Sequence, residues 1–186
     1  MRKNFGSKPA MYPMPVLIVA AYDENGTPNA MTAAWGGIVD TNLIGICLSA
    51  GHKTTQNIFA KGYYTVSMAT VQRMVEADYL GIVSGNTEPD KLAKAGLHTT
   101  KSETVDAPLI DELPMALECK FVSYDKATGY LIGEILNICA DESVLNEQGN
   151  VDPFKLNPIT YDPMNHLYLA LGQKVGDAYQ EGKKLK

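Results

Sequence analysis

Small residues dominate one stretch of this chain, Asn29-Ala30-Met31-Thr32-Ala33-Ala34-Trp35-Gly36-Gly37. The pattern indicates a strand that ends in an aromatic residue, and small side chains let a planar ligand approach main-chain N–H and C=O groups closely. The same composition also suits a sheltered strand whose small residues accommodate a neighbouring helix. The stretch therefore predicts a bed for a flat ring, with a helix contact as the alternative.

A second stretch follows one apolar run and reads Ser49-Ala50-Gly51-His52-Lys53-Thr54-Thr55-Gln56-Asn57. It places polar donors on a turn before a helix-compatible segment, residues 54–60. The free N–H groups at a helix start, the helix dipole and a lysine all favour a phosphate. A plainer alternative makes Thr54 a helix cap and Lys53 a solvated charge. Because the predicted ring-binding strand lies just upstream, we favour the first interpretation, in which this stretch binds the anionic end of a nucleotide.

Two common nucleotide-binding motifs are absent from this region. Five residues separate Gly45 from Gly51, and His52 stands before Lys53 and Thr54, so the Walker pattern fails. No glycine-rich dinucleotide fingerprint follows Leu48. We therefore expect no dedicated nicotinamide-binding domain, and NADH or NADPH would have to dock transiently beside the predicted flat ring.

Length and charge limit the class of protein. With 186 residues and 45% apolar composition, the chain predicts a single domain over residues 1–186, with flexible ends at 1–10 and 180–186. It shows no apolar segment long enough for a membrane span and no signal-type stretch, which indicates a cytoplasmic protein. The formal net charge of -5 argues against nucleic acid or an anionic membrane as a bulk partner.

The cysteines and histidines do not predict a metal site. Cys47, Cys119 and Cys139 are widely separated among apolar neighbours, which favours buried, reduced thiols over disulfides or a zinc cluster. His98 and His166 have no metal-like partners at short spacing. An imidazole near a bound redox ring can donate a proton, but no sequence pattern shows that His166 reaches such a ring.

Apolar runs separated by turn residues predict most of the secondary structure. We expect these strands to form a closed antiparallel barrel with helical inserts, because closure removes the exposed edges of a sheet. A long loop with one short helix or strand is expected at 142–162. The expected strands are 16–22, 28–39, 43–48, 63–68, 115–124 and 130–140, and the expected helices are 54–61, 71–83 and 89–95.

Together with Pro13-Met14-Pro15-Val16-Leu17-Ile18-Val19, the two stretches resemble the flavin reductase-like, or flavoredoxin, family of FMN-binding split barrels. The resemblance continues more weakly through Ser84-Gly85 and Asp90-Lys91 to Leu171-Gly172-Gln173-Lys174-Val175-Gly176. It implies a mainly β fold, a six-stranded antiparallel split β-barrel of Greek-key type with short helical inserts. It also implies FMN as the cofactor and a homodimer with flavin clefts at its twofold interface. The related pyridoxamine-phosphate-oxidase-like branch matches the two stretches less well.

The resemblance also implies a set of site residues. It puts Asn29 to Trp35 beside the isoalloxazine ring, and it brings Ser84, Asp90 and Lys91 near the cofactor or the opposite subunit. A solvated turn and helix start is the alternative for these last three. No catalytic residue and no metal ligand is assigned. The candidate cofactor-binding residues are Asn29, Ala30, Met31, Thr32, Ala33, Ala34, Trp35, Ser49, Ala50, His52, Lys53, Thr54, Thr55, Asn57, Ser84, Asp90 and Lys91.

The resemblance implies an FMN-dependent oxidoreductase or electron carrier. Electrons would come from NAD(P)H or from a redox protein, since a flavin supplies its own redox chemistry and the protein holds and tunes it. A non-catalytic flavin-binding or redox-sensing module is the alternative, because the motifs describe binding better than turnover. The choice between NADH and NADPH, the acceptor, and whether FMN is retained or released are not encoded in these motifs.

Overall fold

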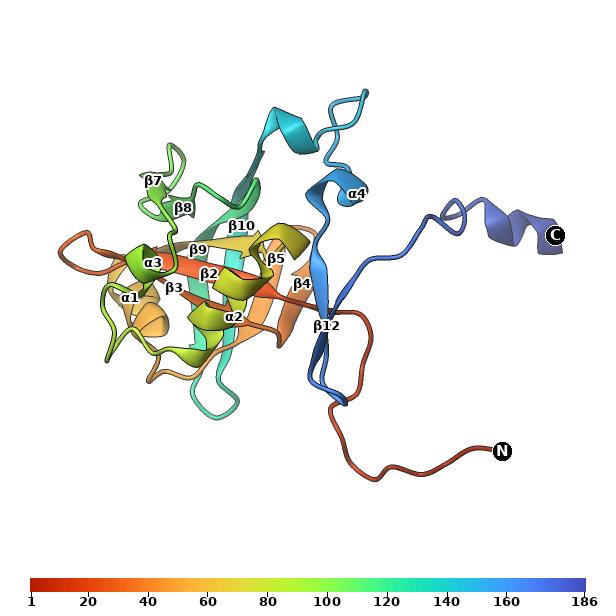
Figure 1. Ribbon diagram of the computed structural model, residues 1–186, viewed down its shortest axis with the longest axis horizontal. Coiled ribbons are helices and arrows are strands. Elements are labelled where there is room, and N and C mark those ends of the chain that lie inside the picture. Colours follow the sequence, from red (N-terminus) through yellow and green to blue (C-terminus); the bar gives the residue numbers. More distant parts are fainter.

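A seven-stranded antiparallel sheet forms the centre of the protein, seen in a computed structural model that describes residues 1–186 (Figure 1). The strand order is β3-β2-β6-β9-β10-β5-β4. All neighbouring strands in it are antiparallel. The strands are β2 (Leu17–Tyr22), β3 (Pro28–Ala33), β4 (Gly36–Asp40), β5 (Leu43–Cys47), β6 (Tyr63–Met68), β9 (Met115–Asp125) and β10 (Tyr130–Ala140).

Only two residues connect the opposite edges of this sheet. Ala34 and Trp35 join β3 at one edge to β4 at the other. A residue spans at most about 3.5 Å, so the sheet must curl until its edges approach each other. The prediction of a mainly β, antiparallel split barrel with short helices is confirmed. The main sheet has seven strands and not six, because the segment expected as one strand at 28–39 breaks at these two residues.

Strand β2 is buried on both faces, which explains its continuous apolar run. Leu17, Val19 and Ala21 face the barrel interior, where they pack with side chains from β5, β6, β9 and β10. The alternate residues, Ile18 and Ala20, belong to a second core between the sheet and the helices. The two cores therefore share one central strand.

Short helices and two small sheets cover the barrel. The helices are α1 (Lys53–Lys61), α2 (Met74–Ile82), α3 (Lys91–Lys94) and α4 (Pro153–Leu156). One small sheet has the order β1-β11-β12 (Met14–Pro15, Ile159–Asp162, Leu167–Ala170), and the other pairs β7 (Thr99–Lys101) with β8 (Pro108–Ile110). No helix is both long and apolar enough to cross a membrane.

One local prediction is wrong. Cys47 is exposed and not buried, because it ends β5 at the rim of the barrel, where its Sγ lies 3.3 Å from the carbonyl oxygen of Thr128. The carboxyl-terminal residues form a short 3₁₀ helix, Glu181–Leu185, in which every residue is exposed. Cys119 is buried as expected, and Cys139 is partly buried.

Candidate functional site

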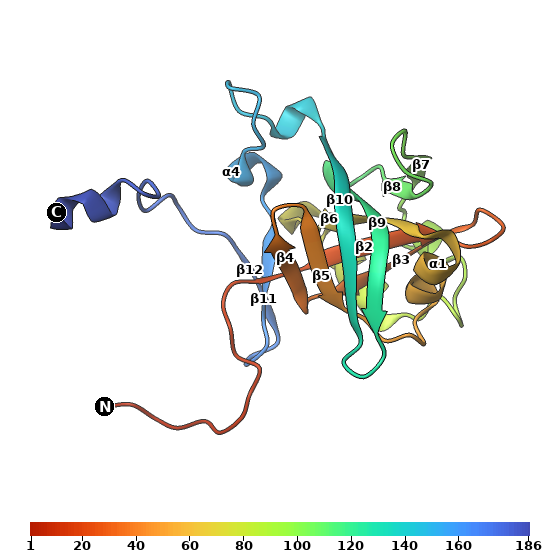
Figure 2. The same cartoon turned by 180° about the vertical axis from the view of Figure 1, so that it is seen from behind.

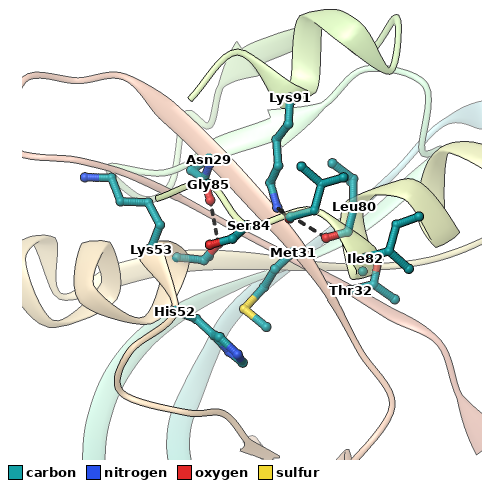
Figure 3. Close-up of a pocket in the computed structure, with 13 residues that line it drawn as sticks. Asn29, Met31, Thr32, His52, Lys53, Leu80, Ile82, Ser84, Gly85 and Lys91 are labelled. Atoms are coloured by element: carbon teal, nitrogen blue, oxygen red, sulfur yellow. Dashed lines mark hydrogen bonds between the residues drawn. The ribbon is translucent and has the colours of Figure 1, made fainter. Parts of the chain in front are cut away.

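A cavity of about 200 Å³ lies between β3, the start of α1 and the segment after α2 (Figure 3). The sequence brings these elements together because the apolar side of α2 packs against the second core over β3. The cavity is mostly polar at one end and apolar where α2 borders it. Its lining residues are Asn29, Met31, Thr32, His52, Lys53, Thr54, Leu80, Gly81, Ile82, Val83, Ser84, Gly85 and Lys91.

The first turn of α1 offers unpaired backbone donors at the polar end. His52 occupies the N-cap position, and no side chain caps the helix. The N–H groups of Lys53, Thr54 and Thr55 donate no hydrogen bond within the protein. Such a helix start, with the positive end of its dipole, attracts an anion.

Thr54 does not act as the cap, because its hydroxyl is used elsewhere. Its Oγ1 donates a 2.8 Å hydrogen bond to Oδ1 of Asn29, and both residues are buried. This bond holds the start of α1 against β3. The Nδ2 group of Asn29 donates no hydrogen bond within the protein, so it remains a donor for a ligand. Gly85 packs so closely that a Cβ there would lie 2.3 Å from this nitrogen.

Lys91 brings a buried ammonium into the cavity (Figure 3). Its Nζ donates to the carbonyl oxygens of Leu80 at 3.2 Å and Val83 at 2.9 Å, which lie at the carboxyl end of α2. No carboxylate pairs with it, and the residue is only 1% exposed. Burial lowers the pKa of Lys91 to about 8. Two carbonyls leave one of its N–H groups available, so the cavity holds a cation that lacks a counter-ion.

Lys53 takes a different direction from the one expected. It lines the cavity, but its Nζ lies 3.8 Å from Oδ2 of Asp23, and Figure 3 shows its end pointing away from Lys91. The side chain is a third exposed. In this conformation the cation inside the cavity is Lys91, while Lys53 stands at the rim.

A second hollow of about 330 Å³ continues from the cavity along β3. The two share Thr32, Gly81 and Ile82. Its other lining residues are Val16, Ala33, Ala34, Asp78, Tyr161, His166 and Tyr168. Both hollows follow the small-residue strand, so together they form one elongated trough.

Two hydrogen-bonded pairs of side chains line the second hollow. Tyr161 Oη lies 2.9 Å from Nδ1 of His166, and Tyr168 Oη donates to Asp78 at 2.7 Å. Burial, and then the Asp78 carboxylate, raise the pKa of Tyr168 to about 12. His166 has a left-handed backbone, with a φ of 56°, at the turn between β11 and β12. His166 thus has a backbone conformation that few residues other than glycine adopt, and this conformation sets the position of its imidazole.

The small residues of β3 also accommodate a helix, which was the alternative expectation. A Cβ at Gly81 would lie 3.3 Å from Cβ of Thr32, and Thr32 Oγ1 donates to the carbonyl oxygen of Ala77. The strand therefore does both: it packs against α2 and forms the floor of the trough.

The predicted site residues divide into three groups: those that line the cavity, those that line a neighbouring hollow, and those that line neither. Eight line the cavity: Asn29, Met31, Thr32, His52, Lys53, Thr54, Ser84 and Lys91. Ala33 and Ala34 line the second hollow, and Trp35, which is 47% exposed, lines a third hollow that shares Ala34. The others lie elsewhere. Ala30 is in the core, Ser49 and Ala50 are exposed in the turn, Thr55 and Asn57 lie on the buried face of α1, and Asp90 is exposed near Lys94.

The sequence reasoning missed the end of α2 and the β11–β12 turn. Leu80, Gly81, Ile82, Val83 and Gly85 line the cavity. A glycine inside an apolar helix was the available signal at Gly81. His166 was left out, and only the tertiary structure brings it to the trough.

Comparisons with known proteins agree with this architecture. A family described as "Flavin reductase like domain" matches residues 10–163. The solved flavoredoxin of Desulfovibrio vulgaris (Miyazaki F) is 36% identical, with a TM-score of 0.93 over 98% of this chain and 100% of that chain. The flavoredoxin of Methanosarcina acetivorans is 27% identical, with a TM-score of 0.89 and full coverage of both chains.

Two further comparisons are more distant. An FMN-binding domain of a flavin reductases-like enzyme from Shewanella baltica is 22% identical and shares the fold, with a TM-score of 0.78 over 88% of each chain. The chain spans 62% and 45% of the length of two curated relatives that it matches in sequence.

Proposed function

This chain belongs to the flavin reductase-like family, and on that premise we propose that it is an FMN-binding oxidoreductase that passes electrons from NAD(P)H or a redox partner. The observation that carries the proposal is the unpaired Lys91 ammonium, which shares a cavity with the uncapped start of α1. A buried cation with no carboxylate is costly unless an anion joins it. The phosphate of FMN is such an anion.

The residues present fit the two ends of FMN. At the polar end, the N–H groups of the first turn of α1, Asn29 Nδ2 and Lys91 Nζ are donors for a phosphate and the adjoining hydroxyls. Along β3, Thr32 to Ala34 border the trough with small side chains, so a flat ring can lie against the backbone. The direction of the trough thus matches a phosphate at the α1 end and a ring toward Ala34.

FMN, when bound, would supply the electron-accepting and electron-donating chemistry. The protein's part is to hold the phosphate, to exclude water from the apolar wall formed by Leu80 and Ile82, and to place polar groups beside the ring. Tyr161 and His166 form the hydrogen-bonded pair that faces that region. We propose that His166, oriented through Nδ1 by Tyr161, donates or accepts a proton there.

The matched pair Lys91→Met and Lys53→Met tests the phosphate end. We expect Lys91→Met to weaken FMN binding by on the order of 1–3 kcal/mol, because a charge-assisted hydrogen bond is lost. Lys53→Met should have the smaller effect, since its ammonium lies at the rim beside Asp23. Fluorescence titration with FMN and with riboflavin, which lacks the phosphate, measures both variants.

Riboflavin distinguishes recognition of the phosphate from support of the fold. If Lys91→Met weakens both flavins equally, Lys91 serves the carboxyl end of α2 and the phosphate assignment fails. If Lys53→Met has the larger FMN-specific effect, the Lys53 side chain moves into the cavity when FMN binds.

Turnover separates an oxidoreductase from a binding module. An oxidoreductase should oxidise NADH or NADPH with FMN present, or reduce its flavin from a redox protein. A protein that binds FMN stoichiometrically but accepts electrons from none of these donors would be a non-catalytic flavin-binding or redox-sensing module.

We also propose that two copies form a homodimer. Ile82 lines both the cavity and the second hollow, yet it is 75% exposed, and Val75 on the same helix is 71% exposed. Apolar side chains at the mouth of a binding site favour a partner that covers them. Light scattering at micromolar concentration should give twice the chain mass, and a monomer that retains FMN would contradict this.

A further inference from the structure

The polar end of the cavity adjoins a further polar hollow of about 170 Å³. This hollow lies between α1 and the turn that joins β2 to β3, and Lys53 lines both the hollow and the cavity. Figures 1 and 2 show that the turn projects from the barrel beside α1. The two spaces therefore meet at Lys53. The residues that line the hollow are Asp23, Glu24, Asn25, Lys53, Gln56, Asn57 and Ala60.

Protein occupies the other sides of this end of the cavity. Nδ2 of Asn86 donates a 2.9 Å hydrogen bond to the carbonyl oxygen of Gly51, so the segment after α2 is joined to the turn before α1. On the inner side, Asn29 and Lys91 are both buried. A ligand that continues beyond a phosphate at the start of α1 would therefore pass Lys53 and enter the polar hollow.

The carboxylate of Asp23 is fixed at the wall of this hollow. Its Oδ1 accepts hydrogen bonds from the backbone N–H groups of Asn25 at 2.9 Å and Thr27 at 2.8 Å. The hydrogen bond from Thr27 is the main cause that lowers the pKa of Asp23, so the group is ionised at neutral pH. These bonds belong to the turn itself, and they keep the carboxylate from rotating out of the hollow.

The hollow carries a net negative charge. It contains the carboxylates of Asp23 and Glu24 and one ammonium, that of Lys53. The Nζ of Lys53 lies 3.8 Å from Oδ2 of Asp23, so this ammonium already has an anionic neighbour. No aromatic side chain lines the hollow, so an adenine ring would find no stacking surface there. The hollow is thus unfavourable for a second phosphate and for an adenosine.

We propose that Asp23 is a specificity-determining residue, which makes the site accept FMN and reject flavin adenine dinucleotide (FAD). FMN ends in its phosphate, so its negative charge stays within the cavity, which Asp23 does not line. FAD adds a second phosphate and an adenosine at this point, and these would meet the Asp23 carboxylate in the hollow. Repulsion of this kind discriminates between two ligands that share all their other contacts. The inference rests on the proposed function, because it needs the flavin phosphate at the start of α1.

Isothermal titration calorimetry of the full chain with FMN and with FAD measures the ratio of their dissociation constants. Asp23→Asn removes the charge but keeps a carbonyl oxygen for the N–H groups of Asn25 and Thr27, so the turn is retained. We expect the wild type to bind FMN more tightly. Asp23→Asn should lower the FAD-to-FMN ratio by about threefold or more, because a like-charge contact is lost. Molar salt should lower the wild-type ratio and leave that of Asp23→Asn nearly constant.

Asp125→Asn is the matched control. Oδ1 of Asp125 accepts from the N–H of Ala127 in the β9–β10 turn, as Asp23 does in its own turn, and Asp125 lines neither the cavity nor the hollow. Figure 2 shows the β9–β10 turn at a different end of the barrel from the β2–β3 turn. The control makes the same change in net charge, and it should leave the ratio of dissociation constants unchanged.

Glu24→Gln provides a second variant that spares the hydrogen bonds of the turn, because Glu24 is exposed. It should change the ratio in the same direction as Asp23→Asn. A wild type that binds FAD as tightly as FMN would overturn the proposal and leave the proposed function standing. So would a ratio that Asp23→Asn leaves unchanged, or that Asp125→Asn changes equally. A chain that binds neither flavin would contradict the proposed function and this inference together.

Discussion

At the scale of single residues, the close packing around Asn29 and Lys91 determines which donor groups face the cavity. Asn29 accepts from Thr54 on one side and touches Gly85 on the other, so an amide donor faces the cavity. Lys91 is kept inside by two carbonyl oxygens and has no carboxylate partner. These positions favour one orientation of an anionic ligand.

Gly85→Ala should damage the cavity more than the fold. The new Cβ would lie 2.3 Å from Nδ2 of Asn29, so the amide must move and its bond to Thr54 is strained. We expect FMN affinity to fall by about 1–3 kcal/mol, the cost of a displaced buried donor. The matched control is Gly37→Ala, where nothing lies within 4 Å of the added Cβ. Equal affinities of the two variants would contradict this account of Asn29.

The buried lysine predicts a pH dependence of stability in the absence of ligand. The pKa of Lys91 is about 8 in the folded state and 10.5 as the ordinary value. Between these values the unfolded chain holds a proton that the folded one has lost, so the free energy of unfolding rises with pH. Urea denaturation should show wild type gaining relative to Lys91→Met, by at most about 1.4 kcal/mol per pH unit. A constant difference across this window would show that Lys91 is not desolvated.

At the scale of elements, strands β6 and β10 pack closely across the barrel interior through one tyrosine and one glycine. Tyr64 on β6 is fully buried, its hydroxyl has no hydrogen-bond partner, and burial raises its pKa. A Cβ at Gly133 on β10 would lie 1.8 Å from that hydroxyl oxygen. β10 therefore needs a glycine here so that the tyrosine ring fits between the strands.

Gly133→Ala should destabilise the barrel by about 1–3 kcal/mol or more, because the interior has no room for the methyl group. Tyr64→Phe removes an unpartnered hydroxyl, so it should be close to neutral. In the Tyr64→Phe background, Gly133→Ala should cost less, since the nearest atom is gone. A double-mutant cycle by urea denaturation measures the coupling. The same cost in both backgrounds would show that the strands separate to admit the methyl group.

At the scale of the whole molecule, one curled sheet and its attached hairpin produce the trough. The floor comes from β3, one wall from α2 and the other from β11 and β12. Ala34 and Trp35, which connect the two edges of the sheet, lie at the end of the trough.

The sequence alone determined the strands of the main sheet apart from the break between β3 and β4, the β2–β3 and β9–β10 hairpins, and the two stretches that form the polar and small-residue parts of the trough. These features depend on local periodicity and on turn residues, which a single segment carries within itself. It also placed Lys91 among the candidates, through the family resemblance.

Only the tertiary structure decided which ammonium is buried, where the sheet closes and that His166 reaches the trough. Each of these depends on segments far apart in the chain: Lys91 is buried by the end of α2, and Lys53 is drawn to Asp23 at the rim. Burial and side-chain direction arise from packing between elements, and no pattern within one segment specifies them.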